Sequence, residues 1–100
     1  MSNLSPLDQM LRQIGFYLSG DLRLAVLVGN LESLHDVIVG ESESWKRCLF
    51  KKIGDLEQVN AVMLDRGMDE VDETGKMIVN KALNELVVLV NEAKSRPKRD

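Results

Sequence analysis

Few side chains in this sequence are suited to catalysis. The chain has one histidine, His35, and one cysteine, Cys48, and they fall on different predicted helices. Glu32 and His35 have the Glu-x-x-His spacing of dimetal carboxylate proteins, but such a site needs a second histidine. The sequence contains no HExxH, CxxC, Walker or GxSxG motif. We therefore interpret His35 as a partly exposed structural residue and Cys48 as a buried one, and we predict no enzyme, no metal site and no cofactor.

Acidic residues form two tracts along the chain. The first tract lies between Arg23 and Lys46, with no basic residue among its members. These are Glu32, Asp36, Glu41 and Glu43. The second tract surrounds a predicted turn and is offset only by Arg66. Its members are Asp65, Asp69, Glu70, Asp72 and Glu73. Solvation and favourable charge near helix N-termini account for part of this pattern, and the alternative is a negative surface that docks on a basic partner.

Basic residues gather in two places. One patch lies on a predicted helix and contains Lys46, Arg47, Lys51 and Lys52. We expect this patch to pair with acidic residues of neighbouring helices. The second is the tail, residues 94–100, whose charge of +3 leaves −6 for residues 1–93 of a chain with net charge −3. An acidic body disfavours nucleic-acid binding, and the RPKR segment of the tail is the one alternative.

These charged residues lie on or between predicted helices. We expect the shorter helices to pack against the longest one. Apolar residues recur every three or four positions across residues 45–67, which predicts one amphipathic helix. Ser42 or Ser44 is placed to cap its start, and Gly67 to end it. An earlier helix begins at residues 5–8, SPLD, where a serine cap precedes proline at the first helical position.

The second predicted helix spans about residues 22–39. Asp21 is placed to cap its start, and Gly40 to end it. Its Leu24–Val28 cluster is predicted to be buried on nearly all sides. Gly29 costs this helix about 1 kcal/mol relative to alanine, and we expect close approach of another helix to explain it.

A fourth helix completes the predicted fold. It begins at Glu73 or Gly75, with Asp72 or Thr74 as its cap, and it ends near Ala93. Only four aromatic residues occur in the chain, so the core must be aliphatic. Four helices joined by short turns predict an all-α protein, an antiparallel four-helix bundle.

Residues 1–94 are predicted to form a single helical domain, followed by a basic tail over 95–100 that we expect to be disordered. The longest apolar run, Leu24–Val28, is far shorter than the roughly 20 residues that span a bilayer. Nothing at the N-terminus resembles a signal peptide. A single cysteine rules out an internal disulfide, so we expect a cytoplasmic protein without a membrane partner.

Four segments of the sequence together resemble the pattern of a known group of proteins. They are LSGD at 18–21, LESL at 31–34, ESW at 43–45 and GDLEQVNAVMLDRG at 54–67. With these segments, residues 18–90 resemble small, all-helical bacterial immunity proteins, which neutralise toxins of the contact-dependent-inhibition and colicin kinds. The sequence departs from that pattern at Ile53, where an aromatic residue is usual, and at Asn60, where tyrosine or an aliphatic residue is common.

The resemblance implies a stoichiometric inhibitor that binds a cognate toxin domain and performs no chemistry. Because RNA-cleaving toxins have basic substrate grooves, an acidic helical face would take the place of RNA phosphates. The partner-binding residues it implies are Asp65, Asp69, Glu70, Asp72 and Glu73, with Glu41 and Glu43 as a second group. The alternative is a non-catalytic adaptor or regulatory protein that self-associates, for example as a homodimer, through apolar surface on the second and fourth helices.

Overall fold

The computed structural model describes residues 4–96, and this part of the chain is helical, with no strand. The helices are α1 (Pro6–Leu18), α2 (Leu24–Val37), α3 (Glu43–Asp65) and α4 (Glu73–Ser95). This confirms the prediction of an all-α bundle of four helices. None of these helices combines the length and the hydrophobicity needed to cross a membrane. The predicted tail contributes Ser95 to α4, and its residues 97–100 lie outside the described residues.

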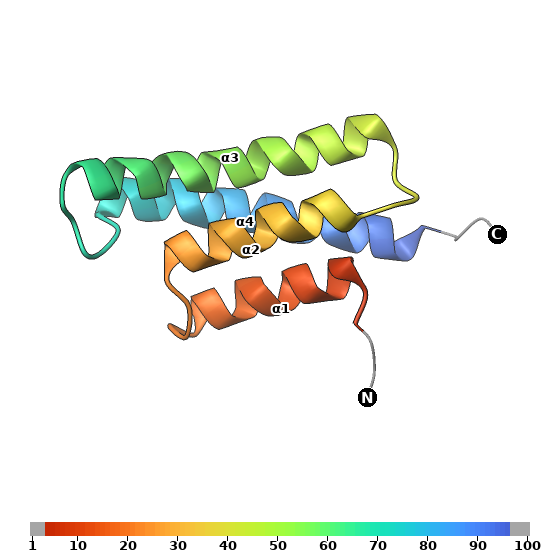
Figure 1. Cartoon of the computed structure of the whole chain (residues 1–100), viewed down its shortest axis with the longest axis horizontal. Helices are drawn as coiled ribbons and strands as arrows, with labels where there is room; N and C mark the ends of the chain where they lie inside the picture. Colours follow the sequence, from red (N-terminus) through yellow and green to blue (C-terminus); the bar gives the residue numbers. More distant parts are fainter. Residues whose placement is uncertain (1–3, 97–100) are drawn as a thin grey trace.

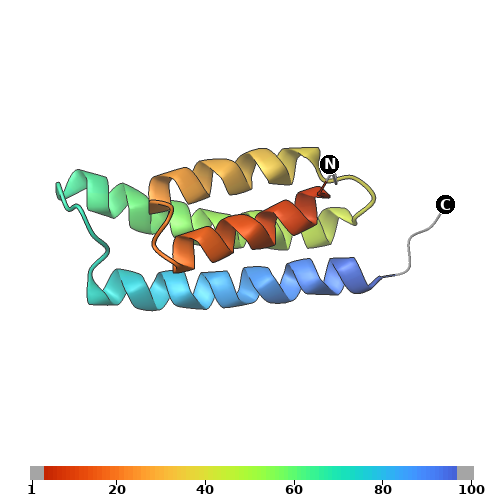
Figure 2. The same cartoon turned by 90° about the horizontal axis from the view of Figure 1, so that it is seen from below.

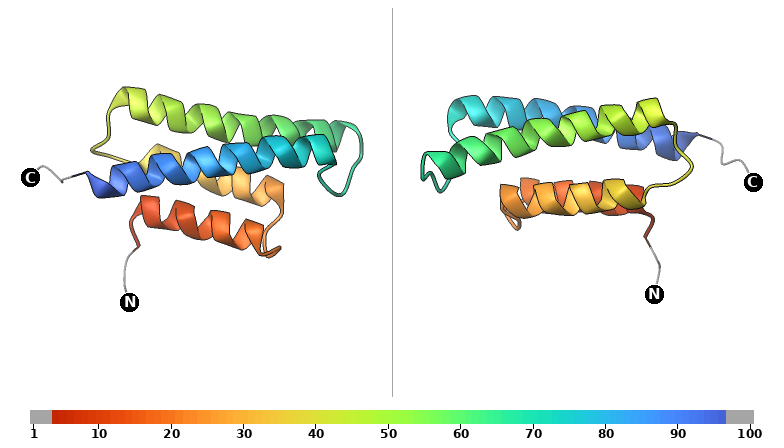
Figure 3. Two further views of the ribbon diagram at one scale, coloured as in Figure 1. Left: turned by 180° about the vertical axis from the view of Figure 1, so that it is seen from behind. Right: turned by 45° about the horizontal axis from the view of Figure 1, so that its top comes forward.

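Each helix packs against two others, so that the four helices occupy the corners of a bundle. α1 lies against α2 and α4, and α3 also lies against α2 and α4 (Figure 2). The three connecting loops lie at alternate ends of the bundle (Figure 1). Because α3 and α4 are much longer than α1 and α2, their shared loop projects beyond the α1–α2 hairpin (Figures 1 and 3).

Side-chain caps start three of the helices. The hydroxyl of Ser5 accepts from the Asp8 N–H at 3.2 Å, and that of Ser42 accepts from the Trp45 N–H at 3.2 Å. The Asp72 carboxylate accepts from the Gly75 N–H at 2.7 Å. Each bond satisfies a backbone donor that the first helical turn leaves without an intrahelical partner.

The predicted ends of α2 are wrong by about two residues. The helix begins after Arg23, whose side chain makes no capping bond. Asp21, the predicted cap, instead accepts from the Ser19 hydroxyl at 2.9 Å. At the other end Ile38 adopts extended backbone and is buried, which ends the helix before Gly40. Gly40 takes a φ of +84° and Gly67 a φ of +64°, the left-handed conformation in which glycine is least strained.

The core is aliphatic, as predicted, with Leu27, Leu31, Leu49 and Leu56 fully buried. Trp45 also lies in the core, and its indole N–H donates to the Leu89 carbonyl at 3.0 Å. This bond links the start of α3 to the last third of α4.

The prediction that the Leu24–Val28 cluster is buried on nearly all sides is wrong. Ala25 and Val26 are exposed, because only α1 and α3 pack against α2. A Cβ atom added at Gly29 would meet no atom within 4 Å. Close approach of another helix of the same chain therefore does not explain this glycine.

Candidate functional site

His35 has a structural contact that accounts for its position. Its Nε2 lies 3.1 Å from the Lys46 carbonyl, which can only accept, so Nε2 carries the proton and donates. Nδ1 is buried without a hydrogen-bond partner, 3.6 Å from the Asp36 carboxylate. The ring packs against Phe50, with 5.2 Å between ring centroids. His35 therefore links α2 to α3 and is partly exposed, as predicted.

Cys48 is exposed, so the prediction of a buried cysteine is wrong. It lies on the side of α3 that faces α4, away from His35, and the two do not form a nucleophile–base pair. The described residues contain no group of three or more histidine, cysteine, aspartate or glutamate side chains able to hold a metal ion.

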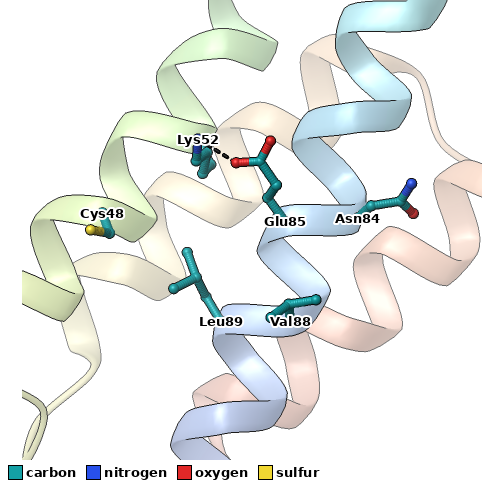
Figure 4. A pocket seen from close by; sticks show the side chains of 6 residues that line it. All are labelled: Cys48, Lys52, Asn84, Glu85, Val88 and Leu89. Carbon is teal, nitrogen blue, oxygen red and sulfur yellow. Dashed lines mark ion pairs between the residues drawn. The ribbon is translucent and has the colours of Figure 1, made fainter.

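A shallow groove of about 350 Å³ lies on the surface between α3 and α4, beside Cys48. Figure 4 shows its lining residues, which are Cys48, Lys52, Asn84, Glu85, Val88 and Leu89. The Lys52 ammonium and the Glu85 carboxylate form an ion pair across it. Their hydrogen bond raises the pKa of Lys52 and lowers the pKa of Glu85, so both stay charged near neutral pH. The groove therefore offers apolar contact and a neutralised ion pair, with no free base.

The second acidic tract is gathered at one end of the bundle. We call it the acidic tip, and its residues are Asp65, Asp69, Glu70, Asp72 and Glu73, at the end of α3, in the α3–α4 loop and at the start of α4. All five are exposed. Within residues 4–96, no cation lies within 4.0 Å of the carboxylates of Asp65, Asp69 and Glu70. Asp72 is committed to the cap of α4, and Glu73 lies 3.9 Å from Lys76.

The charge of the whole chain is concentrated at this tip. Residues 65–73 contain the five acids and Arg66 and so carry a charge of −4, whereas the net charge of the chain is −3. The rest of the chain therefore sums to +1. An isolated negative end of this kind creates a local potential that attracts cationic partners.

Exposed apolar side chains flank the acidic tip on α3 and α4, and the sequence analysis did not associate them with the acids. Leu64 is 70% exposed and Met77 is 73% exposed, while Val62 and Ile78 are each more than two-fifths exposed. Val62, Leu64 and Met77 fall outside the apolar stripes that face the core, which is the one sequence signal that could have found them. Ile78 falls on the stripe predicted for the fourth helix, with Ala82 and Leu86, and its exposure shows that this part of the stripe was wrong. Apolar side chains among charged ones are the usual composition of a protein-binding surface.

The second predicted group, Glu41 and Glu43, lies at the other end of α3 (Figure 1). The 23 residues of α3 separate it from the acidic tip by about 35 Å, at about 1.5 Å per residue. Glu41 is partly buried, and its carboxylate accepts from the Arg96 guanidinium. The structure therefore does not bring the two acidic groups together on one surface.

The basic patch of α3 is only partly paired. Lys52 binds Glu85, but Lys46 donates to the Ile38 carbonyl at 3.1 Å and not to an acid. Arg47 and Lys51 are exposed. The prediction that this patch pairs with neighbouring helices is thus confirmed for Lys52.

Comparison with known proteins gives no relative on which to base an assignment. No family model, curated protein or solved structure matches the chain. The resemblance to bacterial immunity proteins therefore stays a prediction.

Proposed function

We propose that this protein is an immunity protein, an antiparallel four-helix bundle that binds a cognate bacterial toxin domain in the cytoplasm and neutralises it without catalysis. The observation that carries the proposal is the acidic tip, which holds a larger negative charge than the chain as a whole. The sequence resemblance supports the same function. The proposed partner is a basic toxin domain, such as a nuclease with a phosphate-binding groove.

The proposed contact combines exposed apolar side chains with the neighbouring carboxylates of the acidic tip. Leu64 and Met77 expose more side-chain surface than most apolar residues of this chain, and burying them on a partner would supply favourable free energy. The carboxylates of Asp65, Asp69 and Glu70 would face lysine and arginine side chains of the partner. Interfaces of this type gain most of their affinity from a few buried side chains, and their partner choice and association rate from charge.

The availability of these acids supports their proposed role. Forming the interface would break no internal ion pair of Asp65, Asp69 or Glu70, since these carboxylates bind no cation within the described residues. Glu41 differs, because docking through it would first require separation from Arg96. We therefore propose the acidic tip as the docking surface and assign Glu41 to the fold.

The test measures binding to the C-terminal domain encoded by the reading frame immediately upstream. We expect Asp69→Ser/Glu70→Ser to weaken binding by about tenfold or more, with a slower association rate and a smaller dependence on salt. Glu43→Ser, which removes one exposed acid at the far end of α3, is the control and should bind like the wild type. Equal affinity of all three proteins would reject the acidic tip, and no binding by the wild type would reject the function.

A second candidate function, a self-associating adaptor, is favoured by one observation. The outward surface of α2 is exposed and nearly uncharged. A stable oligomer together with failure to bind any neighbouring toxin domain would favour this candidate over the first.

A further inference from the structure

The outward face of α2 has few charges for an exposed helix surface. One of its six exposed residues is charged, against five of twelve in α3. The six, which we call the α2 face, are Ala25, Val26, Gly29, Ser33, Asp36 and Val37. Val26 is 45% exposed and Val37 is 57% exposed. A helix that is apolar on most of its sides is typical of one that is covered all round, yet α1 and α3 cover only part of it.

The shape of the α2 face also suits a close partner. Gly29 lies in the middle of the helix, and the space above it is open. Small side chains at Ala25 and Ser33 lie one turn away on each side of it. Together they leave a flat strip along which another helix backbone can approach closely.

The charges at the two ends of α2 indicate which partner fits. Arg23 is exposed at the start of the helix, and the Asp36 side chain is 80% exposed at its end. These two residues lie at nearly equal distances along the helix from Gly29. If a second copy packs with its α2 running in the opposite direction, Arg23 of each copy approaches Asp36 of the other. A parallel arrangement would bring like charges together instead.

We propose that two copies of this protein form a dimer through their α2 faces, antiparallel and related by a twofold axis near Gly29. Such an interface uses the same surface on both copies, which a twofold requires. It also places the two acidic tips at opposite ends of the dimer, where they do not repel each other and both stay open to partners. The face is small, so the dimer is expected to be weak and to depend on concentration.

Sedimentation velocity over a micromolar-to-millimolar concentration series tests the dimer with the full chain. The wild type should approach twice the monomer mass, and Val26→Glu/Val37→Glu should stay at the monomer mass. Val88→Glu, which places one glutamate at a 58% exposed valine of α4, should dimerise like the wild type. A wild type that stays monomeric throughout, or a dimer that Val26→Glu/Val37→Glu leaves intact, would overturn the proposal.

Two further variants separate dimer loss from unfolding. Gly29→Ala should raise the melting temperature of the monomer, because its Cβ meets no atom, and should still weaken the dimer. Gly54→Ala on α3 also adds a Cβ that meets nothing, and it should raise the melting temperature without affecting the dimer. Equal dimer strength in the two variants would overturn the assignment of Gly29 to the interface.

A charge swap tests the antiparallel arrangement. Arg23→Asp and Asp36→Arg should each weaken the dimer, and the double variant should restore it. Both single changes favour the isolated helix, since aspartate caps an N-terminus and arginine complements a C-terminus. Loss of the dimer in a single variant that keeps the wild-type melting temperature therefore does not come from unfolding. A double variant that remains monomeric would overturn the antiparallel pairing.

Discussion

The two ends of this bundle both carry acidic residues, but the contacts of these residues differ between the ends. We call the end that holds the α2–α3 loop and the start of α1 the closed end. There Glu41 binds Arg96, and Asp8 binds Lys94 at 2.6 Å. At the acidic tip, three carboxylates bind no cation within the described residues. Glu41 and Asp8 are therefore part of the fold, while Asp65, Asp69 and Glu70 of the tip are available to another molecule.

Helix length is the physical origin of this difference. α3 and α4 project past α1 and α2 at the acidic tip, so the loop between them has few neighbours (Figure 3). At the closed end the start of α1, the α2–α3 loop and the end of α4 meet, and Trp45 is buried nearby. A substitution at the closed end should therefore change stability, and one at the tip should change binding.

The largest expected effect is the loss of Trp45 near the closed end. Trp45→Ala removes a buried side chain and its hydrogen bond to Leu89, and should lower the free energy of unfolding by about 3–5 kcal/mol. Met77→Ala near the tip should change it by about 0.5 kcal/mol or less, because Met77 is exposed. Urea denaturation measures both. Equal losses in the two variants would contradict the distinction between the ends.

Asp72 is the exception within the acidic tip, since its side chain caps α4. Asp72→Ala should lower the free energy of unfolding by about 1 kcal/mol. Asp69→Ala removes the same charge from the neighbouring loop and should change stability by about 0.5 kcal/mol or less. If Asp69→Ala were as destabilising as Asp72→Ala, the tip would be a structural element and not a free surface.

The ion pair of Arg96 and Glu41 should contribute less than the cap. Arg96→Gln should cost about 1 kcal/mol or less, because the pair is partly exposed. Arg47→Gln is the control, because Arg47 is an exposed residue of α3 that forms no ion pair within residues 4–96. Thermal melts of both variants in low and high salt give the comparison. A larger loss in Arg47→Gln would remove the basis for assigning Glu41 to the fold.

The sequence predicted the helices well because the signals for them are local. Ser5, Ser42 and Asp72 each cap a helix through a residue three positions away, and periodic apolar residues define the core. The prediction for the start of α2 was wrong because the Asp21 carboxylate accepts from the Ser19 hydroxyl, and the helix begins two residues later without a side-chain cap.

The candidate site was predictable in part. The acids of the tip are adjacent in sequence, so their clustering followed from the turn at residues 66–72. The ion pair of Glu41 with Arg96 was not predictable, because the two residues are 55 positions apart and the sequence predicts a disordered tail at Arg96. The exposure of Cys48 was missed for a similar reason, since helical periodicity alone does not say which borderline position a neighbouring helix covers.

The smallest expected effect is the pH dependence of the Lys52–Glu85 pair, which lies between the two ends. Since Lys52 lowers the pKa of Glu85 below its ordinary value of 4.5, the pair stabilises the fold above that value. This contribution is lost as the pH falls through the lowered pKa of the folded state. Glu85→Gln should therefore show a weaker loss of melting temperature between pH 5 and pH 2 than the wild type. Equal losses of melting temperature between pH 5 and pH 2 in the two proteins would contradict this prediction.

The most direct test of the central claim is an NMR titration of the isotopically labelled protein with the toxin domain encoded upstream. The account predicts that the largest amide shifts fall on residues 62–78, around Leu64, Asp69 and Met77. Largest shifts at the closed end, around Glu43 and Arg96, with residues 62–78 unchanged, would contradict it.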